Sequence, residues 1–153
     1  MLGPIVNPAQ PKYQLVGVFS LELARLYAYL YQKSDKKYTI LHTLDGYDEV
    51  SLTTDFKIFS TMGERVYSVE DLGFGKMNAT SIRGGDTVQE SSLIFKSVLM
   101  GEGTAEQNKV VLANAALAIK TIHSDRSFAD CFSEASEALF SKRALTSFKK
   151  LVS

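Results

Sequence analysis

The sequence predicts an α/β fold in which part of a mixed, mainly parallel sheet is flanked by helices. Residues 14–42 read as strand, helix and strand, an order that is typical of a βαβ unit with parallel strands. Only about four strand candidates are present, and the second half of the chain carries helical patterns. This excess of helices over strands indicates a portion of a larger sheet.

Strands are predicted where short apolar runs lie between turn residues, at 14–19, 38–42, 56–60 and 65–69. Gly63 separates the last two runs, which predicts a hairpin. Between the first two, Ser20 is a suitable cap for a helix. That helix has one apolar stripe at helical spacing, made by Leu23, Leu26, Tyr27, Leu30 and Tyr31.

Four helices are predicted after an irregular, glycine-containing crossing at 70–86. Capping boxes begin the first two, one from Thr87 to Glu90 and one from Thr104 to Gln107. Apolar spacing predicts a third helix, and the fourth is short. Their expected extents are 87–101, 104–121, 128–139 and 143–152.

Composition excludes several classes of protein. The 153 residues fit one domain, and 17 basic residues balance 17 acidic ones, which gives no support for binding nucleic acid or an anionic membrane. No apolar run approaches the roughly 20 residues that span a bilayer. The single cysteine, Cys131, excludes an internal disulfide and favours a reducing, cytoplasmic location.

The most informative stretch is 42–53, in which a short apolar strand leads into a loop with two adjacent carboxylates, Asp48 and Glu49. Ligands of parallel sheets bind beyond the carboxyl ends of the strands, where this loop is expected. Such a pair suits Mg²⁺, which prefers a few carboxylates together with water and substrate phosphates. A solvated acidic turn is the alternative, and the residues alone favour it because Asp and Gly are common in turns.

A family resemblance changes this balance. The segment LGPIVNPA at residues 2–9 and the strand after it resemble a hinge and strand of anthranilate phosphoribosyltransferase. The segment HTLDGYDE at 42–49 resembles the Asp-Glu element of the same family, in the same order and at similar spacing. Further landmarks, GGD at 84–86 and LANAA at 112–116, extend the resemblance along nearly the whole chain.

The resemblance implies a function and an incomplete domain. Members of the family transfer the phosphoribosyl group of phosphoribosyl pyrophosphate to anthranilate in tryptophan biosynthesis, and they are much longer than 153 residues. Residues 1–153 would be the carboxy-terminal portion of the α/β domain, without the amino-terminal helical domain and the pyrophosphate loop. The full-length protein is expected to be a homodimer, and this portion alone is expected to be inactive.

The resemblance also assigns roles to individual residues. Asp48 and Glu49 would bind the Mg²⁺ ions that accompany the pyrophosphate, and no catalytic residue is assigned. Pro4 and Asn7 would border the channel through which anthranilate enters, although Gly-Pro and Asn-Pro pairs are also ordinary turn residues. Mg²⁺ is the expected cofactor because negative charge builds on the leaving pyrophosphate during the transfer.

Four other candidates are better explained by structure than by chemistry. His42 could act as a general base, but a histidine at the end of a strand is more often buried or bonded to a loop. The glycines at 84–86 could bind a phosphate, but a tight turn before the Thr87 cap is favoured. Asn114 is expected to pack and bond locally within its helix, and Cys131 is expected to be a small core residue.

Three other functions stay open. A pyrimidine nucleoside phosphorylase has a related fold, but phosphorolysis has no need for a metal-bound pyrophosphate and therefore does not explain Asp48 and Glu49. A non-enzymatic relative that binds nucleic acid, or a truncated paralogue that acts as an interaction module, would also fit the resemblance. A nucleic-acid-binding relative should have a basic face, for which the balanced charge gives no support.

Overall fold

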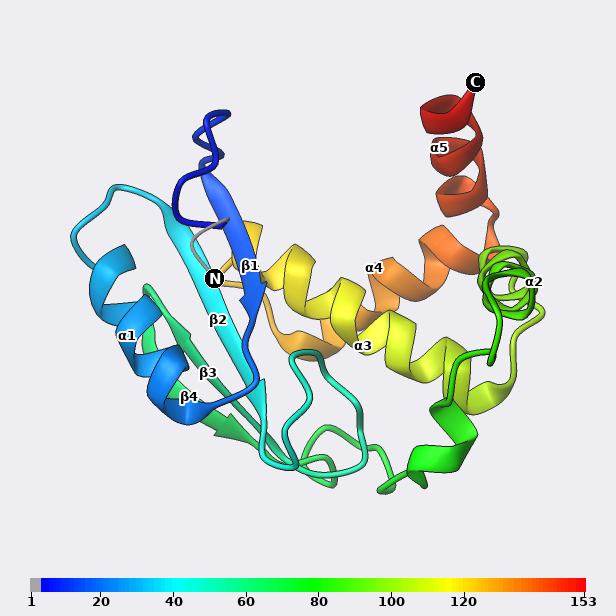
Figure 1. The fold of residues 1–153 in the computed structure, drawn as a ribbon, viewed down its shortest axis with the longest axis horizontal. Helices are drawn as coiled ribbons and strands as arrows, with labels where there is room; N and C mark the ends of the chain where they lie inside the picture. The colour runs from blue at the N-terminus through cyan, green and yellow to red at the C-terminus, as the bar shows by residue number, and fades with distance from the viewer. Residues whose placement is uncertain (1–3) are drawn as a thin grey trace.

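A four-stranded sheet with helices on both faces lies toward one end of the molecule (Figure 1). The computed structural model describes residues 4–153. The elements, in chain order, are β1 (Tyr13–Gly17), α1 (Leu21–Tyr31), β2 (Lys37–Thr43), β3 (Phe56–Ser60), β4 (Gly63–Tyr67), the 3₁₀ helix η1 (Ala79–Ile82), α2 (Val88–Leu99), α3 (Ala105–Ile122), α4 (Phe128–Phe140) and α5 (Arg143–Val152). Helices α3 and α4 extend from the sheet toward α2 and α5 (Figure 1).

The strand order is β1-β2-β3-β4, with β1 and β2 parallel and the other two pairings antiparallel. The α/β class and the mixed sheet are therefore confirmed. Within these four strands the parallel pairing is in the minority, because α1 is the only helical crossover between neighbouring strands. Strands β1, β2 and β4 end, and β3 begins, at the same end of the sheet. The pairs Gly17–Leu41, Thr43–Phe56 and Phe56–Tyr67 show this alignment.

The predicted helix starts are confirmed by their capping bonds. The Ser20 hydroxyl accepts a hydrogen bond from the Leu23 amide at the start of α1. Thr87 and Thr104 each form a complete capping box, α2 with Glu90 and α3 with Gln107. These bonds join residues three apart, so they depend only on local sequence.

Two local details differ from the sequence-based expectation. Strand β4 begins at Gly63, two residues earlier than predicted, because Ser60 pairs with Gly63 across a two-residue loop. Gly63 has a φ of 103°, which glycine adopts without the strain that a side chain would add. The short helix η1, capped by Asn78, lies in the crossing predicted to be irregular, because four residues are too few to show a periodicity.

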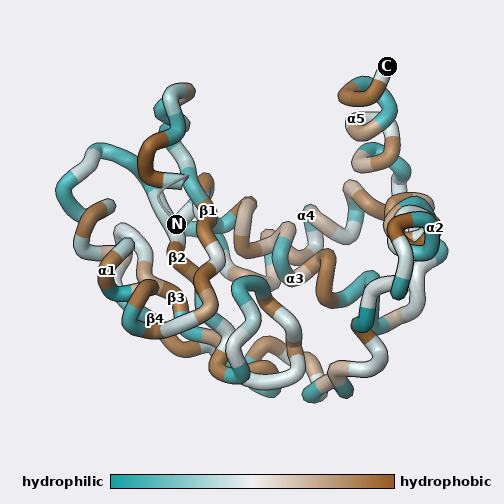
Figure 2. The backbone as a smooth tube through the Cα atoms, viewed as in Figure 1, coloured by the Kyte–Doolittle hydropathy of each residue, from teal (hydrophilic) through white to brown (hydrophobic). Residues whose placement is uncertain are grey.

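The sheet separates two hydrophobic cores, and Figure 2 shows hydrophobic residues concentrated along its strands. The face toward α1 buries Val16, Val18, Ala24, Tyr27, Ala28, Tyr31, Tyr38, Ile40 and Phe59. The face toward α3 and α4 buries Leu41, Val50, Leu52, Phe56, Ile58, Tyr67, Val69, Ala113, Ala116, Leu117, Phe128 and Cys131. Val50 and Leu52 belong to the connection between β2 and β3, so this core extends into that loop.

Cys131 is completely buried, as predicted for a core residue. Burial raises the pKa of the Cys131 thiol, so the thiol stays protonated at neutral pH and is a poor nucleophile. None of the helices in residues 4–153 is both long and apolar enough to cross a bilayer.

Helix α3 is held against the sheet by Leu117, which is 1% exposed, and by a buried hydrogen bond from Thr121 to Thr39 of 2.8 Å. Changing Leu117 to Ala leaves a cavity in this core. We expect the free energy of unfolding, measured in urea, to fall by about 2–5 kcal/mol. Val111→Ala is the matched control because Val111 lies on the same helix and is 44% exposed. That change should alter stability by less than about 0.5 kcal/mol. Equal urea midpoints for the two variants would contradict this packing.

Candidate functional site

The loop of residues 44–55 connects β2 to β3 at the end of the sheet where β1 and β2 finish (Figure 1). Asp48 and Glu49 lie in this loop, and both side chains are exposed. The loop therefore lies beyond the carboxyl ends of the parallel strands, as the sequence predicted. Three structural contacts, from β1, β2 and α3, hold its main chain.

The first contact is the close approach of the Asp48 main chain to Gly17, the last residue of β1. A Cβ atom at Gly17 would overlap the carbonyl oxygen of Asp48 and would lie 2.6 Å from its carbonyl carbon. Because real Cβ atoms do not approach main-chain atoms so closely, only glycine allows the loop to lie here.

The second contact comes from Thr43, a fully buried residue at the end of β2. Its hydroxyl donates a hydrogen bond to the carbonyl oxygen of Glu49. Its amide donates to the carbonyl oxygen of Tyr47 at 3.0 Å. The main chain on both sides of Asp48 is thus tied to the same strand residue.

The third contact comes from Asn114 in the middle of α3. Its Oδ1 accepts from the amide of Val50 at 2.9 Å, and its Nδ2 donates to the carbonyl oxygen of Val50 at 2.8 Å. Nδ2 also donates to Val110 one turn earlier in the helix, at 2.9 Å. The local bond expected for Asn114 is therefore present, but its other two bonds reach Val50, outside the helix, which the sequence did not predict.

The Asn114 contact lies beyond the reach of local sequence patterns because 64 residues separate the two partners. One sequence signal was available: an amide side chain stands among the Val, Leu and Ala residues of α3. A polar side chain on a largely buried helix usually has a hydrogen-bond partner, so the position indicated that a partner exists but not that it lies outside the helix.

The loop contains two further carboxylates, and both have structural partners. Asp45 accepts a hydrogen bond from the Thr53 hydroxyl, and Asp55 accepts from the amide of Val69 at 3.3 Å. By contrast, no side-chain hydrogen bond or ion pair to Asp48 or Glu49 forms within residues 4–153. These two carboxylates are therefore available to a ligand.

The donor set at Asp48 and Glu49 fits Mg²⁺ in its chemistry. No three His, Cys, Asp or Glu side chains of the described chain lie close enough together to hold a metal ion. Magnesium is commonly bound by one or two carboxylates, with water and substrate phosphates as its other ligands. Two exposed carboxylates on a fixed loop meet that requirement, whereas a structural zinc site would need four protein ligands.

His42 is buried and bonded, which agrees with the structural interpretation of this residue. It is 6% exposed, and its Nδ1 donates to the carbonyl oxygen of Val18 at 2.9 Å. The tight turn expected at 84–86 is not formed: residues 84 and 85 are irregular, and the amide of Asp86, at a bend, donates to the Glu90 carboxylate of the α2 cap at 2.8 Å. Neither feature contributes to the loop at 44–55.

Pro4 and Asn7 lie before β1, at the opposite end of this strand from Gly17. The Pro4 carbonyl oxygen accepts from Gln14 at 2.8 Å and from the Tyr31 hydroxyl at 3.2 Å. The Asn7 side chain accepts from the amide of Ala9 at 2.9 Å. The described structure does not bring either residue to Asp48, and the start of this segment, residues 2–3, lies outside the described residues.

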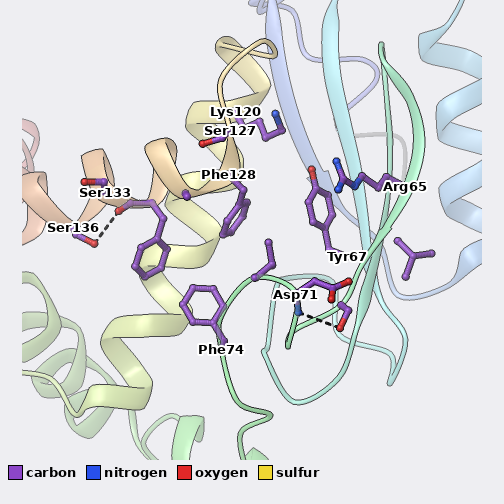
Figure 3. A pocket seen from close by; sticks show the side chains of 14 residues that line it. Arg65, Tyr67, Asp71, Phe74, Lys120, Ser127, Phe128, Ser133 and Ser136 are labelled. Carbon is purple, nitrogen blue, oxygen red and sulfur yellow. Dashed lines mark hydrogen bonds between the residues drawn. The ribbon is translucent and has the colours of Figure 1, made fainter.

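A hollow with a volume of about 680 Å³ lies between β4 and α4 (Figure 3). The rings of Tyr67 and Phe128 line it, and its lining contains no residue of 44–55. Its cations have partners: Arg65 lies 4.8 Å from the Tyr67 ring centre, and Lys120 donates to two main-chain carbonyls. Burial raises the pKa of Tyr67, so its hydroxyl stays protonated. This hollow is separate from the carboxylate loop.

Comparison with known families decides the class of the chain. Residues 1–145 match the family described as "Glycosyl transferase family, a/b domain". The chain belongs to this glycosyl transferase family. The match covers the sheet, the carboxylate loop and most of the helices that surround them.

Relatives of known class are similar along the whole chain. An anthranilate phosphoribosyltransferase of Christiangramia forsetii is 55% identical over 151 residues, which are 99% of this chain and 45% of that protein. The corresponding protein of Bacteroides thetaiotaomicron is 43% identical over 152 residues. The resemblance found in the sequence is confirmed, and the chain spans slightly less than half the length of these glycosyl transferases.

Solved structures of the family share the fold. Anthranilate phosphoribosyltransferase from Thermus thermophilus matches with a TM-score of 0.87 and 23% identity, over 97% of this chain and 45% of that protein. The enzyme from Saccharomyces cerevisiae "in complex with PRPP and Mg" matches with a TM-score of 0.85 and 20% identity, over 97% of this chain and 43% of that protein. The α/β arrangement of this chain is thus the fold of slightly less than half of each of those two structures.

The close approach at Gly17 generates a testable prediction. Gly17→Ala should displace the main chain at Asp48 and destabilise the fold by about 1–3 kcal/mol, as overpacking does. Urea unfolding would measure the stability, and hydrogen exchange across 44–55 would measure the displacement. Gly75→Ala is the control, because a Cβ atom there meets no other atom within 4 Å. If both variants match the parent in both measurements, the steric argument fails.

Proposed function

We propose that this chain is the carboxy-terminal portion of the α/β domain of an anthranilate phosphoribosyltransferase. The complete enzyme would transfer the phosphoribosyl group from phosphoribosyl pyrophosphate to anthranilate and release pyrophosphate, in tryptophan biosynthesis. One observation carries this proposal: a chain that is 55% identical to such an enzyme exposes two carboxylates, Asp48 and Glu49, beyond its parallel strands, and neither has a side-chain partner in residues 4–153.

The two carboxylates would act as metal ligands. Bound there with phosphoribosyl pyrophosphate, Mg²⁺ would neutralise the negative charge that grows on the departing pyrophosphate. Asp48 and Glu49 would contribute anionic oxygens from a loop whose main chain is already held by β1, β2 and α3. This preorganisation matters because ligands that need no rearrangement stabilise the transition state more effectively.

The remaining half of the protein would complete both the sheet and the site. In residues 4–153, β1 pairs only with β2, and its other edge has no strand beside it. Parallel strands are normally buried between neighbours, so we propose that strands of the remaining half pair with this edge. That half would also contain the helical domain and the pyrophosphate loop. For this reason we expect the chain to be inactive alone.

The other assignments are part of the same proposal. Pro4 and Asn7 would border the anthranilate channel, with the rest of its wall supplied by the remaining half. The complete enzyme would be a homodimer in the cytoplasm, where a buried free thiol such as Cys131 stays reduced. Its substrates would be phosphoribosyl pyrophosphate and anthranilate, with no nucleic acid or membrane partner.

The metal assignment is tested by replacing both carboxylates in the complete protein. The double variant Asp48→Ala, Glu49→Ala should lose about 10²-fold or more in turnover, because each electrostatic contact to developing charge contributes on this order. Turnover would be measured as phosphoribosyl anthranilate formed across a Mg²⁺ titration at a fixed concentration of phosphoribosyl pyrophosphate.

The chain offers a matched control for this experiment. Glu70 and Asp71 form a second pair of adjacent, exposed carboxylates outside the 44–55 loop. Glu70→Ala, Asp71→Ala changes the net charge by the same amount and should keep the turnover of the parent. Unchanged turnover of the Asp48, Glu49 variant at limiting Mg²⁺ would remove the metal assignment.

A further inference from the structure

We propose that Asn114 is a positioning residue for the metal-binding carboxylates. It would act by fixing the main chain of Val50, directly after Glu49, so that Asp48 and Glu49 keep the placement that binds Mg²⁺. This inference rests on the proposed function and adds a residue from a distant helix to the same site.

The first argument is the completeness of the Asn114 contact. Val50 is fully buried, so its amide and its carbonyl group both need hydrogen-bond partners inside the protein. Asn114 supplies both, accepting at 2.9 Å and donating at 2.8 Å. The Asn114 side chain therefore satisfies both main-chain polar groups of Val50. It fixes the orientation of the Val50 main chain as the hydrogen bonds of a neighbouring strand would.

The second argument is that Asp48 and Glu49 have no other support. Their side chains are exposed and make no hydrogen bond or ion pair with any part of residues 4–153. Their position is therefore set only by the main chain to which they belong. Gly17 fixes that main chain at 48, Thr43 at 49 and Asn114 at 50.

The third argument concerns what each of these three residues also does. Gly17 and Thr43 belong to strands of the sheet, so changing either one alters the fold directly. Asn114 lies in α3 and is the only one of the three whose side chain can be removed without changing a strand. Residues that orient metal ligands typically contribute 10–100-fold to metal affinity or activity.

The experiment compares Asn114→Ala with Asn108→Ala in the complete protein. Asn108 is a matched control: it lies in the same helix, is 8% exposed, and within residues 4–153 its side chain donates only to the nearby Gly103 carbonyl, at 3.1 Å. For Asn114→Ala we expect the half-saturating Mg²⁺ concentration to rise about tenfold or more. The KM for anthranilate should stay that of the parent, and Asn108→Ala should keep both values.

A second measurement is independent of the reaction. In the metal-free protein, the amide of Val50 is protected by its bond to Asn114. Hydrogen exchange at Val50 and at its neighbours in 47–51 should become faster in Asn114→Ala and stay unchanged in Asn108→Ala. A general loss of stability would instead speed exchange throughout the sheet.

Asn114→Asp keeps the proposal testable if the alanine variant does not fold, because aspartate retains the volume and can still accept from Val50. It loses both donated bonds, so its half-saturating Mg²⁺ concentration should also rise. A half-saturating Mg²⁺ concentration equal to that of the parent, in whichever variant folds, would overturn the positioning role alone. A parent with no Mg²⁺-dependent transfer to anthranilate would overturn the proposed function itself.

Discussion

The pair of hydrogen bonds between the Asn114 amide and the main chain of Val50 is the constraint on which the site depends. It joins α3 to the loop that leaves β2, two segments that no local interaction would bring together. Val50 is fully buried in the core between the sheet and α3, whereas the two residues before it, Asp48 and Glu49, are exposed to solvent. The exposure of Asp48 and Glu49 is thus a consequence of how the next residue is buried.

The four acidic residues of the loop fall into two groups, one with hydrogen-bond partners in the protein and one without. Asp45 and Asp55 have partners within the protein and hold the two ends of the loop. Asp48 and Glu49 have none in residues 4–153, which is the state expected of groups that await a cation. This division gives a protein with no net charge a locally anionic loop, with two adjacent exposed carboxylates.

Strand β1 lies at the edge of the described sheet and ends next to the carboxylate loop. Helices cover both faces of the sheet, but β1 has a neighbour on one side only among the described strands. The carboxylate loop lies at the end of this same strand, beside Gly17. A site built at that position would therefore be shared between this chain and whatever pairs with β1, in agreement with relatives that are about twice as long.

The amino-acid sequence by itself determined the helix starts at Ser20, Thr87 and Thr104, the strand-helix-strand order and the position of the carboxylate loop. These features depend on residues within about four positions of one another, so a local pattern reveals them. Only the tertiary structure decided that Asn114 bonds to Val50 and that the Asp48 main chain lies where a side chain at position 17 would otherwise be. It also decided that the segment with Pro4 lies at the far end of β1. Such contacts depend on how distant segments pack, and they leave no periodic trace along the chain.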